Sequence, residues 1–214
     1  MQGDLDRKSI ASLAVDLPGH GASPLPFGDM YGDAQLVHDL AARIEGPVVL
    51  VGHSYGGAVI TQAAIGLTNV DHLVYVTAFC LDEGEAVRAN PAPRLRTPLA
   101  DAIRPAATEG FQAIDPAFAR DAFYGHCPPY VAAASTARLC WQPNVTFTQP
   151  MKGAPWRQIP STYVVCEHDG AIHPDTQRFF AARCGSIESI GTDHSPFAST
   201  PTVLSSILAG VVRR

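Results

Sequence analysis

The chain has 214 residues, of which 46% are hydrophobic and 16% charged, so it can bury the core of one globular domain and is neither disordered nor fibrous. Its formal net charge is −5 and it has no long basic run. We therefore expect a small, weakly charged substrate, and neither a nucleic-acid partner nor an anionic membrane surface.

Strands and helices alternate in the first part of the chain. A run at 12–16 predicts a strand that the proline and glycines of 17–21 stop. Residues 48–51 are apolar at consecutive positions, as in a central parallel strand covered on both faces. In chain order we predict a strand at 12–16, a helix at 31–44, a strand at 48–51, a helix at 58–67 and a strand at 72–77.

The pattern changes between residues 82 and 160. This segment is rich in alanine and proline, contains helix-like stretches at 116–124 and 129–139, and carries no convincing strand. We predict that it is a helical cap inserted into the domain. The alternation then resumes with strands at 161–166 and 186–190 and helices at 175–183 and 202–212.

The alternation of strands and helices predicts an α/β fold, in which a mostly parallel sheet is flanked by helices and joined by right-handed crossovers. We expect residues 1–81 and 161–214 to form this core and residues 82–160 to form the cap. Residues 1–8 have no apolar signal core, and no later run of about 18 uncharged apolar residues could span a bilayer. We therefore expect a cytoplasmic protein.

The cysteines and histidines give no sign of a metal site. The five cysteines are scattered without C-x-x-C spacing, which predicts reduced thiols rather than disulfides. The histidines lack ligand spacing, and no glycine-rich phosphate loop follows the first strand. We expect no metal and no organic cofactor.

The sequence Gly52-His53-Ser54-Tyr55-Gly56 lies between a predicted strand and a predicted helix, the context of a nucleophile elbow. A serine in so tight a turn has an unfavourable backbone conformation, and Gly52 and Gly56 would supply the room it needs. The Tyr55 N–H, at the start of the helix, would point to where an oxyanion develops. Ser54 is therefore the candidate nucleophile; an ordinary glycine-rich turn is the alternative.

A serine nucleophile needs a histidine base and an acid that orients the base. His194 lies in the loop between the last predicted strand and the last helix, where a base can stand above the carboxyl edge of the sheet. Asp169 comes three residues after the strand at 161–166 and precedes a glycine that lets the loop fold back. We predict His194 as the base and Asp169 as the acid, in the order Ser, Asp, His.

Other residues near these motifs have simpler interpretations. We expect His168 and His173 to be solvated loop residues and His53 to point away from the serine and pack against the sheet. Asp193 should point away from its neighbour. Asp82, which follows an earlier strand, is the rival acid, while Asp169 could instead bond its own backbone as a turn residue.

Four motifs in this order resemble the α/β-hydrolase fold: the Asp-Leu-Pro-Gly-His-Gly run ending at Gly21, the elbow at 52–57, the acid loop at 169–174 and the His-Ser-Pro-Phe run at 194–197. From about Leu13 onward the chain looks most similar to small cofactor-independent bacterial esterases related to plant methylesterases and hydroxynitrile lyases. The resemblance implies Ser54 as nucleophile, His194 as base, Asp169 as acid and the Tyr55 N–H as an oxyanion donor. It also implies a cap that shapes the acyl pocket.

The chain departs from this family at its start. Members open with two or three strands and a His-Gly loop that supplies the second oxyanion N–H, whereas residues 1–10 resemble only the tail of the helix that precedes Ser12. The missing strand would lie between the strands at 12–16 and 48–51. We therefore expect a truncated or wrongly started sequence, or a sheet that closes this gap. Loss of one oxyanion donor costs about 10²–10³ in turnover, or roughly 3–4 kcal/mol.

Three functions are compatible with these residues. The first is a serine esterase that hydrolyses a small, mostly uncharged ester through an acyl-enzyme. The second is a hydroxynitrile-lyase-like reaction in which His194 moves a proton and Lys152, the only lysine besides Lys8, supplies a cation over the pocket. The third is a non-catalytic or impaired relative that binds a small apolar ligand. A homodimer through the C-terminal helix is compatible with the sequence.

Aromatic residues could line the pocket, although aromatics in a cap also form its own core. The candidates are Phe123, Tyr124, Trp156 and Phe197.

Overall fold

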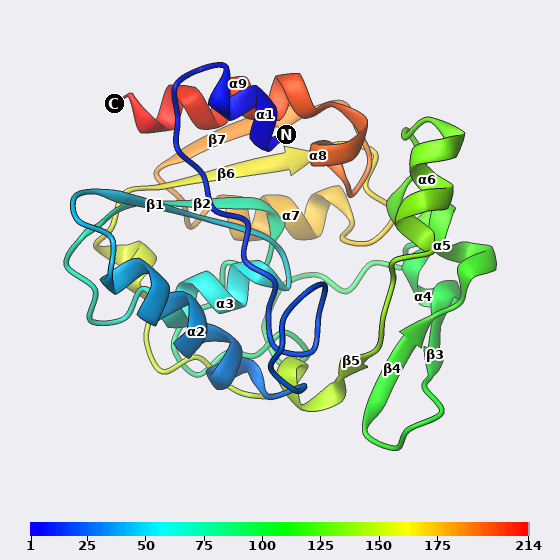
Figure 1. Ribbon diagram of the computed structural model, residues 1–214. Helices are drawn as coiled ribbons and strands as arrows, with labels where there is room; N and C mark the ends of the chain where they lie inside the picture. Colours follow the sequence, from blue (N-terminus) through cyan, green and yellow to red (C-terminus); the bar gives the residue numbers. More distant parts are fainter. Residues whose placement is uncertain (214) are drawn as a thin grey trace.

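The main sheet has four parallel strands in the order β1-β2-β6-β7 (Figure 1). The computed structural model describes residues 1–213. The strands are β1 (Val48–Ser54), β2 (Val70–Ala78), β6 (Ser161–Cys166) and β7 (Ser186–Ile190). The predicted α/β fold with a mostly parallel sheet is confirmed, and β6 and β7 have the predicted bounds.

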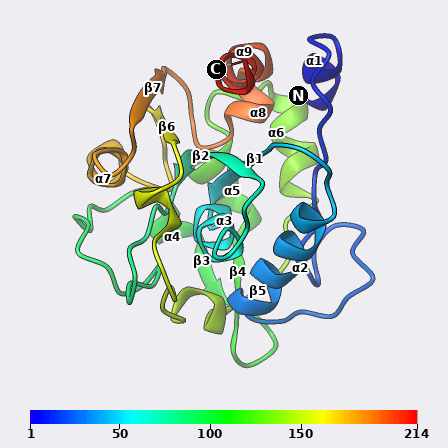
Figure 2. The same cartoon turned by 90° about the vertical axis from the view of Figure 1, so that its left-hand side faces the viewer.

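Helices cover both faces of this sheet (Figure 2). Leu73 and Tyr75 of β2 pack into the core beneath α2, α3 and α7, while Val74 and Val76 pack into a second core beneath α9. This alternation follows from the two-residue period of a strand buried on both sides. One face carries α2 (Met30–Ala42), α3 (Gly56–Ala63) and α7 (Pro174–Ala181), and the other carries α1 (Gln2–Asp6), α8 (Pro196–Ser199) and α9 (Pro201–Val212). No helix within residues 1–213 has the length and apolar character needed to cross a membrane.

The edge of the sheet at β1 differs from our prediction. Residues 12–16 form no strand, and within residues 1–213 no strand pairs with the outer edge of β1. The predicted central strand is therefore an edge strand, with Val51 42% exposed and Leu13 65% exposed. A strand exists only through its ladder of hydrogen bonds, and a local apolar pattern cannot supply the partner.

The segment 82–160 contains a second sheet, which the sequence did not reveal. Three short antiparallel strands pair in the order β3-β4-β5, so the prediction that this segment lacks strands is wrong. With two to four residues each, these strands are too short for a period-two pattern to stand out. The strands are β3 (Ile103–Pro105), β4 (Phe111–Ile114) and β5 (Gln142–Pro143).

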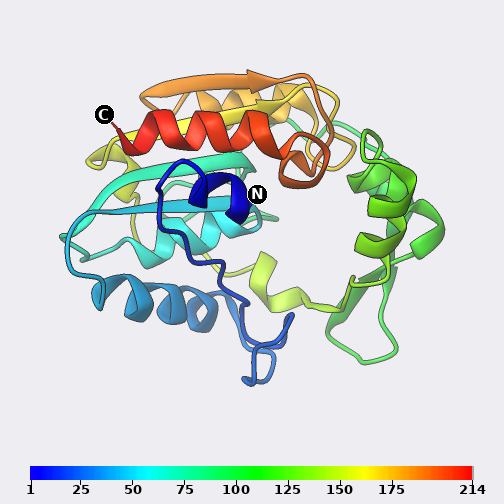
Figure 3. The same ribbon diagram turned by 45° about the horizontal axis from the view of Figure 1, so that its top comes forward.

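The helices of this segment stand near the carboxyl ends of the main strands (Figure 3). The two predicted helices are present, with slightly earlier ends. The helices are α4 (Leu99–Ala102), α5 (Pro116–Phe123) and α6 (Pro129–Thr136), with short 3-10 turns η1 (Asn144–Phe147) and η2 (Pro155–Arg157).

Candidate active site

Ser54 is the last residue of β1 and adopts a φ of +53°, in the left-handed region that non-glycine residues rarely enter. The side chain is partly exposed. The next residue, Tyr55, is the N-cap of α3. The chain therefore makes the strained strand-to-helix bend that a nucleophile elbow requires.

Two glycines make the bend possible, but only one of them is as predicted. A Cβ on Gly52 would lie 2.4 Å from the carbonyl oxygen of Gly56. A Cβ on Gly56 itself would meet nothing within 4 Å, whereas one on Gly57 would lie 2.8 Å from the backbone of Phe79. The second glycine that the elbow needs is thus Gly57 and not Gly56, because α3 begins directly against the end of β2.

His194 and Asp169 meet at the carboxyl ends of the neighbouring strands β6 and β7. The His194 Nδ1 lies 2.7 Å from Asp169 Oδ2, and their side chains are 3% and 0% exposed. Because the ionised carboxylate only accepts hydrogen bonds, Nδ1 carries the proton of a neutral His194 and Nε2 keeps its lone pair. The pair has the arrangement of an oriented base.

Both oxygens of Asp169 are occupied. Oδ1 accepts the backbone N–H groups of Ala171 and Ile172 at 2.6 and 2.9 Å, as the turn interpretation expected. Oδ2 accepts from His194, from the Thr77 hydroxyl and from Gln177 Nε2 at 3.2 Å. Burial alone would raise the pKa of Asp169, but His194 and these hydrogen bonds outweigh burial and lower the pKa below its ordinary value.

Sequence reasoning missed Thr77 and Gln177. Thr77 is the last residue but one of β2 and has a φ of +39°, which is rare for a β-branched residue, and it is fully buried. Gln177 lies on α7, also fully buried, and its Oε1 accepts the N–H of Cys166 at 2.8 Å. The only signal for Gln177 was an amide among the apolar positions of a helix, and Thr77 carried none.

His53 connects the elbow to the base. Its Nε2–H donates to the carbonyl oxygen of His194 at 2.7 Å, and the two ring centroids are 4.6 Å apart. Burial lowers the pKa of His53 to about 3, so the ring is neutral near pH 7 and carries its proton on Nε2. We predicted that His53 packs against the sheet; its ring instead packs against His194 and Phe197.

Tyr55 contributes to the elbow through its side chain as well as its backbone position. Its hydroxyl donates to Asp33 Oδ2 at 2.7 Å, which ties the start of α3 to α2. Asp33 is buried, and burial raises its pKa above the ordinary value of a carboxyl. This bond fixes the residue whose N–H is the candidate oxyanion donor.

Two loops hold the segment 82–160 against the site. Asp193 points away from His194, as expected, and its Oδ2 accepts the backbone N–H of His126 at 2.8 Å. Gly170 allows α5 to approach, because a Cβ there would lie 2.2 Å from the carbonyl oxygen of Asp121. Both loops that carry the acid and the base therefore contact this segment.

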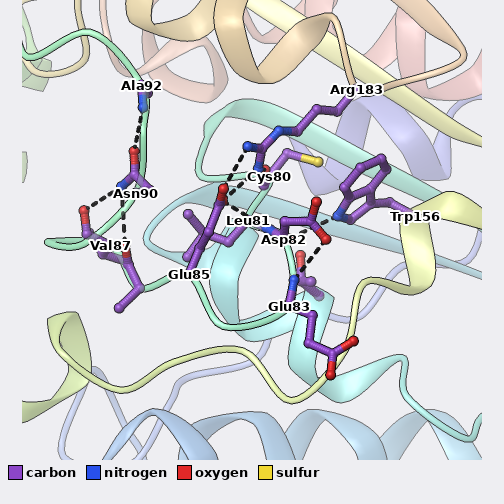
Figure 4. A network of polar contacts seen from close by, with 12 residues as sticks. Cys80, Leu81, Asp82, Glu83, Glu85, Val87, Asn90, Ala92, Trp156 and Arg183 are labelled. Atoms are coloured by element: carbon purple, nitrogen blue, oxygen red, sulfur yellow. Dashed lines mark hydrogen bonds and ion pairs between the residues drawn. The ribbon is translucent and has the colours of Figure 1, made fainter.

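The rival acid Asp82 lies in a different network. Its carboxylate forms an ion pair with Arg157, and its backbone N–H donates to Glu85, whose carboxylate pairs with Arg183 (Figure 4). The structure therefore brings Asp169, and not Asp82, to His194. Of the other histidines, His168 is exposed, as expected, while His173 caps α7 by accepting the N–H of Asp175.

Of the four candidate pocket aromatics, one lies against the base, one lies against His53, and Tyr124 packs with Cys127 and Ala132 in a cluster of the segment 82–160. The Phe123 ring centroid is 5.5 Å from that of His194 and 5.8 Å from that of Tyr124, and Phe197 lies 5.0 Å from His53. Trp156 lies elsewhere, where its indole N–H donates to the carbonyl of Leu81 at 2.8 Å (Figure 4).

Lys152 is engaged away from these rings. Its Nζ lies 4.1 Å from the centroid of the Tyr31 ring on α2, and its backbone N–H donates to Gln62 on α3. Within the described residues, no group of three or more His, Cys, Asp or Glu side chains is placed to hold a metal ion.

An elbow serine at the edge of a parallel sheet, with an oriented histidine beyond later strands, defines an α/β hydrolase. The chain belongs to the alpha/beta hydrolase family, whose model matches residues 3–206. It is 30% identical over 217 residues to the alpha/beta hydrolase nvfD of Aspergillus novofumigatus, covering 94% of this chain and 84% of that protein. It is also 30% identical over 221 residues to a pyrethroid hydrolase of Sphingobium wenxiniae, covering 96% and 79%.

Solved structures agree with this assignment. A pyrethroid hydrolase from Sphingobium faniae superposes with a TM-score of 0.83 at 26% identity, covering 99% of this chain and 90% of that one. A methylesterase from Arabidopsis has a TM-score of 0.80 at 23% identity, covering 98% and 89%. The resemblance to the α/β-hydrolase fold is confirmed, and the relatives are named hydrolases and esterases.

Proposed function

We propose that this protein is a serine hydrolase that cleaves a small, mostly uncharged carboxylic ester. One observation carries the proposal: the buried His194–Asp169 pair, 2.7 Å apart, is tied through His53 to the strand that ends in Ser54. A base that is oriented in this way, and whose loop is bonded to the strand that ends in a strained serine, supports activation of the Ser54 hydroxyl as a nucleophile.

Each residue then has a defined step. The Nε2 lone pair of His194 takes the Ser54 proton as Oγ attacks the ester carbonyl, and Asp169 stabilises the imidazolium that forms. The backbone N–H of Tyr55 donates to the oxyanion. His194 passes the proton to the departing alcohol, which leaves the acyl group on Ser54 Oγ. The same base then removes a proton from water as the water oxygen attacks the acyl carbon, and returns that proton to Oγ as the acyl–Oγ bond breaks and the acid leaves.

The aromatic rings near His194 support a substrate class. Phe123 lies beside the base, Phe197 lies beside His53, and Tyr124 packs against Phe123. These rings favour apolar acyl or alcohol groups. Because two relatives are named pyrethroid hydrolases, pyrethroids are among the first substrates to test, together with p-nitrophenyl esters.

A fluorophosphonate probe tests the nucleophile directly. We expect the full chain to be labelled at Ser54, and Ser54→Ala to abolish both the label and ester turnover. Ser206→Ala is the matched control, because Ser206 is exposed on α9 and bonds only within that helix. A folded chain that takes no label, or an Ser54→Ala variant that is still labelled, would refute the proposal.

The lyase reaction has less support, because Lys152, the cation it would use, lies against Tyr31. If the folded chain binds apolar esters and leaves them intact, the protein is instead a ligand-binding relative without turnover.

A further inference from the structure

Cys80 and Cys184 face each other although they lie 104 positions apart in the chain. Their Sγ atoms are 4.0 Å apart. Cys80 follows β2 and is fully buried, whereas Cys184 follows α7 and is partly exposed. Residue Cys184 therefore reaches the surface in part, while its neighbour Cys80 stays shielded.

A fixed positive charge lies beside this pair. Arg183 Nη1 donates to the carbonyl of Cys80 at 2.8 Å, and its guanidinium pairs with Glu85 at 2.6 Å (Figure 4). The hydrogen bond with Cys80 lowers the pKa of Cys184, and Ser161 and Arg183 add to this effect against burial. Burial raises the pKa of Cys80. Cys184 is thus the thiol that ionises first, and the thiolate is the reactive form.

We propose that Cys80 and Cys184 are a redox-active dithiol that hydrogen peroxide converts to an intramolecular disulfide. The Cys184 thiolate attacks one peroxide oxygen, the O–O bond breaks, and the released hydroxide takes a proton to become water. Cys80 then attacks the sulfur of the sulfenic acid, the S–O bond breaks, and a second water leaves with the Cys80 proton. Peroxide gains two electrons and the two thiols lose them.

The remaining cysteines lack one of these features. Cys127 lies 3.7 Å from Asp193, and its pKa is raised to about 12 by burial and by this carboxylate. Cys166 is buried in β6 with its pKa raised by burial, and Cys140 is exposed without a thiol partner among the described residues. A disulfide bond is about 2 Å long, so the two sulfurs, now 4.0 Å apart, have to approach each other by about 2 Å.

The disulfide would join the two elements that hold Asp169. Cys80 extends the strand that ends near Thr77, and Cys184 extends the helix that carries Gln177. Oxidation would therefore fix β2 and α7 to each other behind the acid of the site.

The test uses the full chain, reduced and then treated with one equivalent of hydrogen peroxide. After free thiols are blocked, trypsin without reductant should release peptide 44–88 linked to peptide 184–213. The linked mass should be two hydrogens below the sum and disappear on reduction. Recovery of both peptides with blocked thiols, while Cys140 carries the oxidation, would overturn the proposal.

Variants assign the order of events. In Cys80→Ser the sulfenic acid of Cys184 should accumulate and react with a 1,3-dione probe, whereas Cys184→Ser should leave Cys80 unlabelled. Cys140→Ser is the matched control and should keep the cross-link. A Cys80→Ser protein with a native circular dichroism spectrum and no dione label at Cys184 would contradict this mechanism. If either variant fails to fold, the tryptic peptide map of the unsubstituted, peroxide-treated chain decides the question.

Discussion

Replacing Thr77 with valine removes one hydroxyl from the Asp169 site while keeping the β-branched shape of the side chain. The hydroxyl donates to Oδ2, the same oxygen that binds His194. In the variant that oxygen keeps only His194 and the longer 3.2 Å bond from Gln177. The expected consequence is an acid that is held less firmly and a base that is less well oriented.

The magnitude follows from the charge of the acceptor. A hydrogen bond to a charged group contributes about 1.5–3 kcal/mol net. If this contribution is lost in the transition state, kcat/KM falls about 10- to 150-fold, mostly in kcat. Thr77→Ser keeps the hydroxyl and should stay within a few-fold of the parent chain.

The same change should alter acid stability. The depressed pKa of Asp169 means that its ionised form contributes stability that is complete above the ordinary value of 3.8 and is lost as pH falls through the folded-state pKa. Without the Thr77 donor that pKa is less depressed. Thr77→Val should therefore begin to unfold at a higher pH than the parent chain when both are acidified.

Steady-state hydrolysis of a p-nitrophenyl ester and urea unfolding, each followed against pH, measure these effects. A folded Thr77→Val protein with kcat/KM within twofold of the parent would refute the reasoning. So would a Thr77→Ser protein that loses as much activity as Thr77→Val, because the methyl group and not the hydroxyl would then matter.

Three further predictions concern other parts of the site. Asp169→Asn should lower kcat by about 10⁴-fold with the fold intact, because the base loses its oriented tautomer. Asp82→Asn should leave kcat unchanged. Equal losses of kcat in the two variants, measured on the same ester, would show that Asp82 has to be considered again as the acid. Gly57→Ala should lower the free energy of unfolding by about 1–3 kcal/mol, since its Cβ would lie 2.8 Å from the backbone of Phe79. A Cβ at Gly56 has open space, so Gly56→Ala is the control. Equal urea midpoints of the two variants would contradict this prediction. Because the pKa of His53 is lowered to about 3, its burial as a neutral ring should lower the free energy of unfolding as pH falls below about 6.5, by up to about 1.4 kcal/mol per pH unit. In His53→Gln the urea midpoint should therefore change less between pH 6 and 4 than in the parent chain.

Local pattern was enough for some elements and failed for others with a similar pattern. β6 has the predicted bounds because a short, mostly apolar run bounded by turns favours a strand covered on both faces, and all six of its residues are buried. Residues 12–16 have a comparable run and form no strand, because pairing is a property of the neighbouring chain and not of the run itself. For β3, β4 and β5 the error is the opposite one: the sequence predicted no strand where the structure has three short strands.

The site divides in the same way. Ser54, Asp169 and His194 stand in motifs that can be read locally, and the structure brings the last two together. Thr77 and His53 act through hydrogen bonds to residues 92 and 141 positions away, and no local pattern encodes such partners. Positioning residues of this kind can be found only once the strands are side by side.

The proposed nucleophile and the proposed acid–base pair rest on parts of the sheet with different support. Asp169 and His194 follow β6 and β7 and are buried, and Asp169 is bound by donors from β2 and α7. Ser54 ends β1, which within residues 1–213 pairs on one side only. His53 connects the strand that carries Ser54 to the loop that carries His194, because it lies on β1 and donates to the His194 carbonyl. We therefore expect movement of β1 to separate Ser54 from His194 while the His194–Asp169 pair stays intact. The proposed activity should then depend more strongly on the support of β1 than the His194–Asp169 contact does.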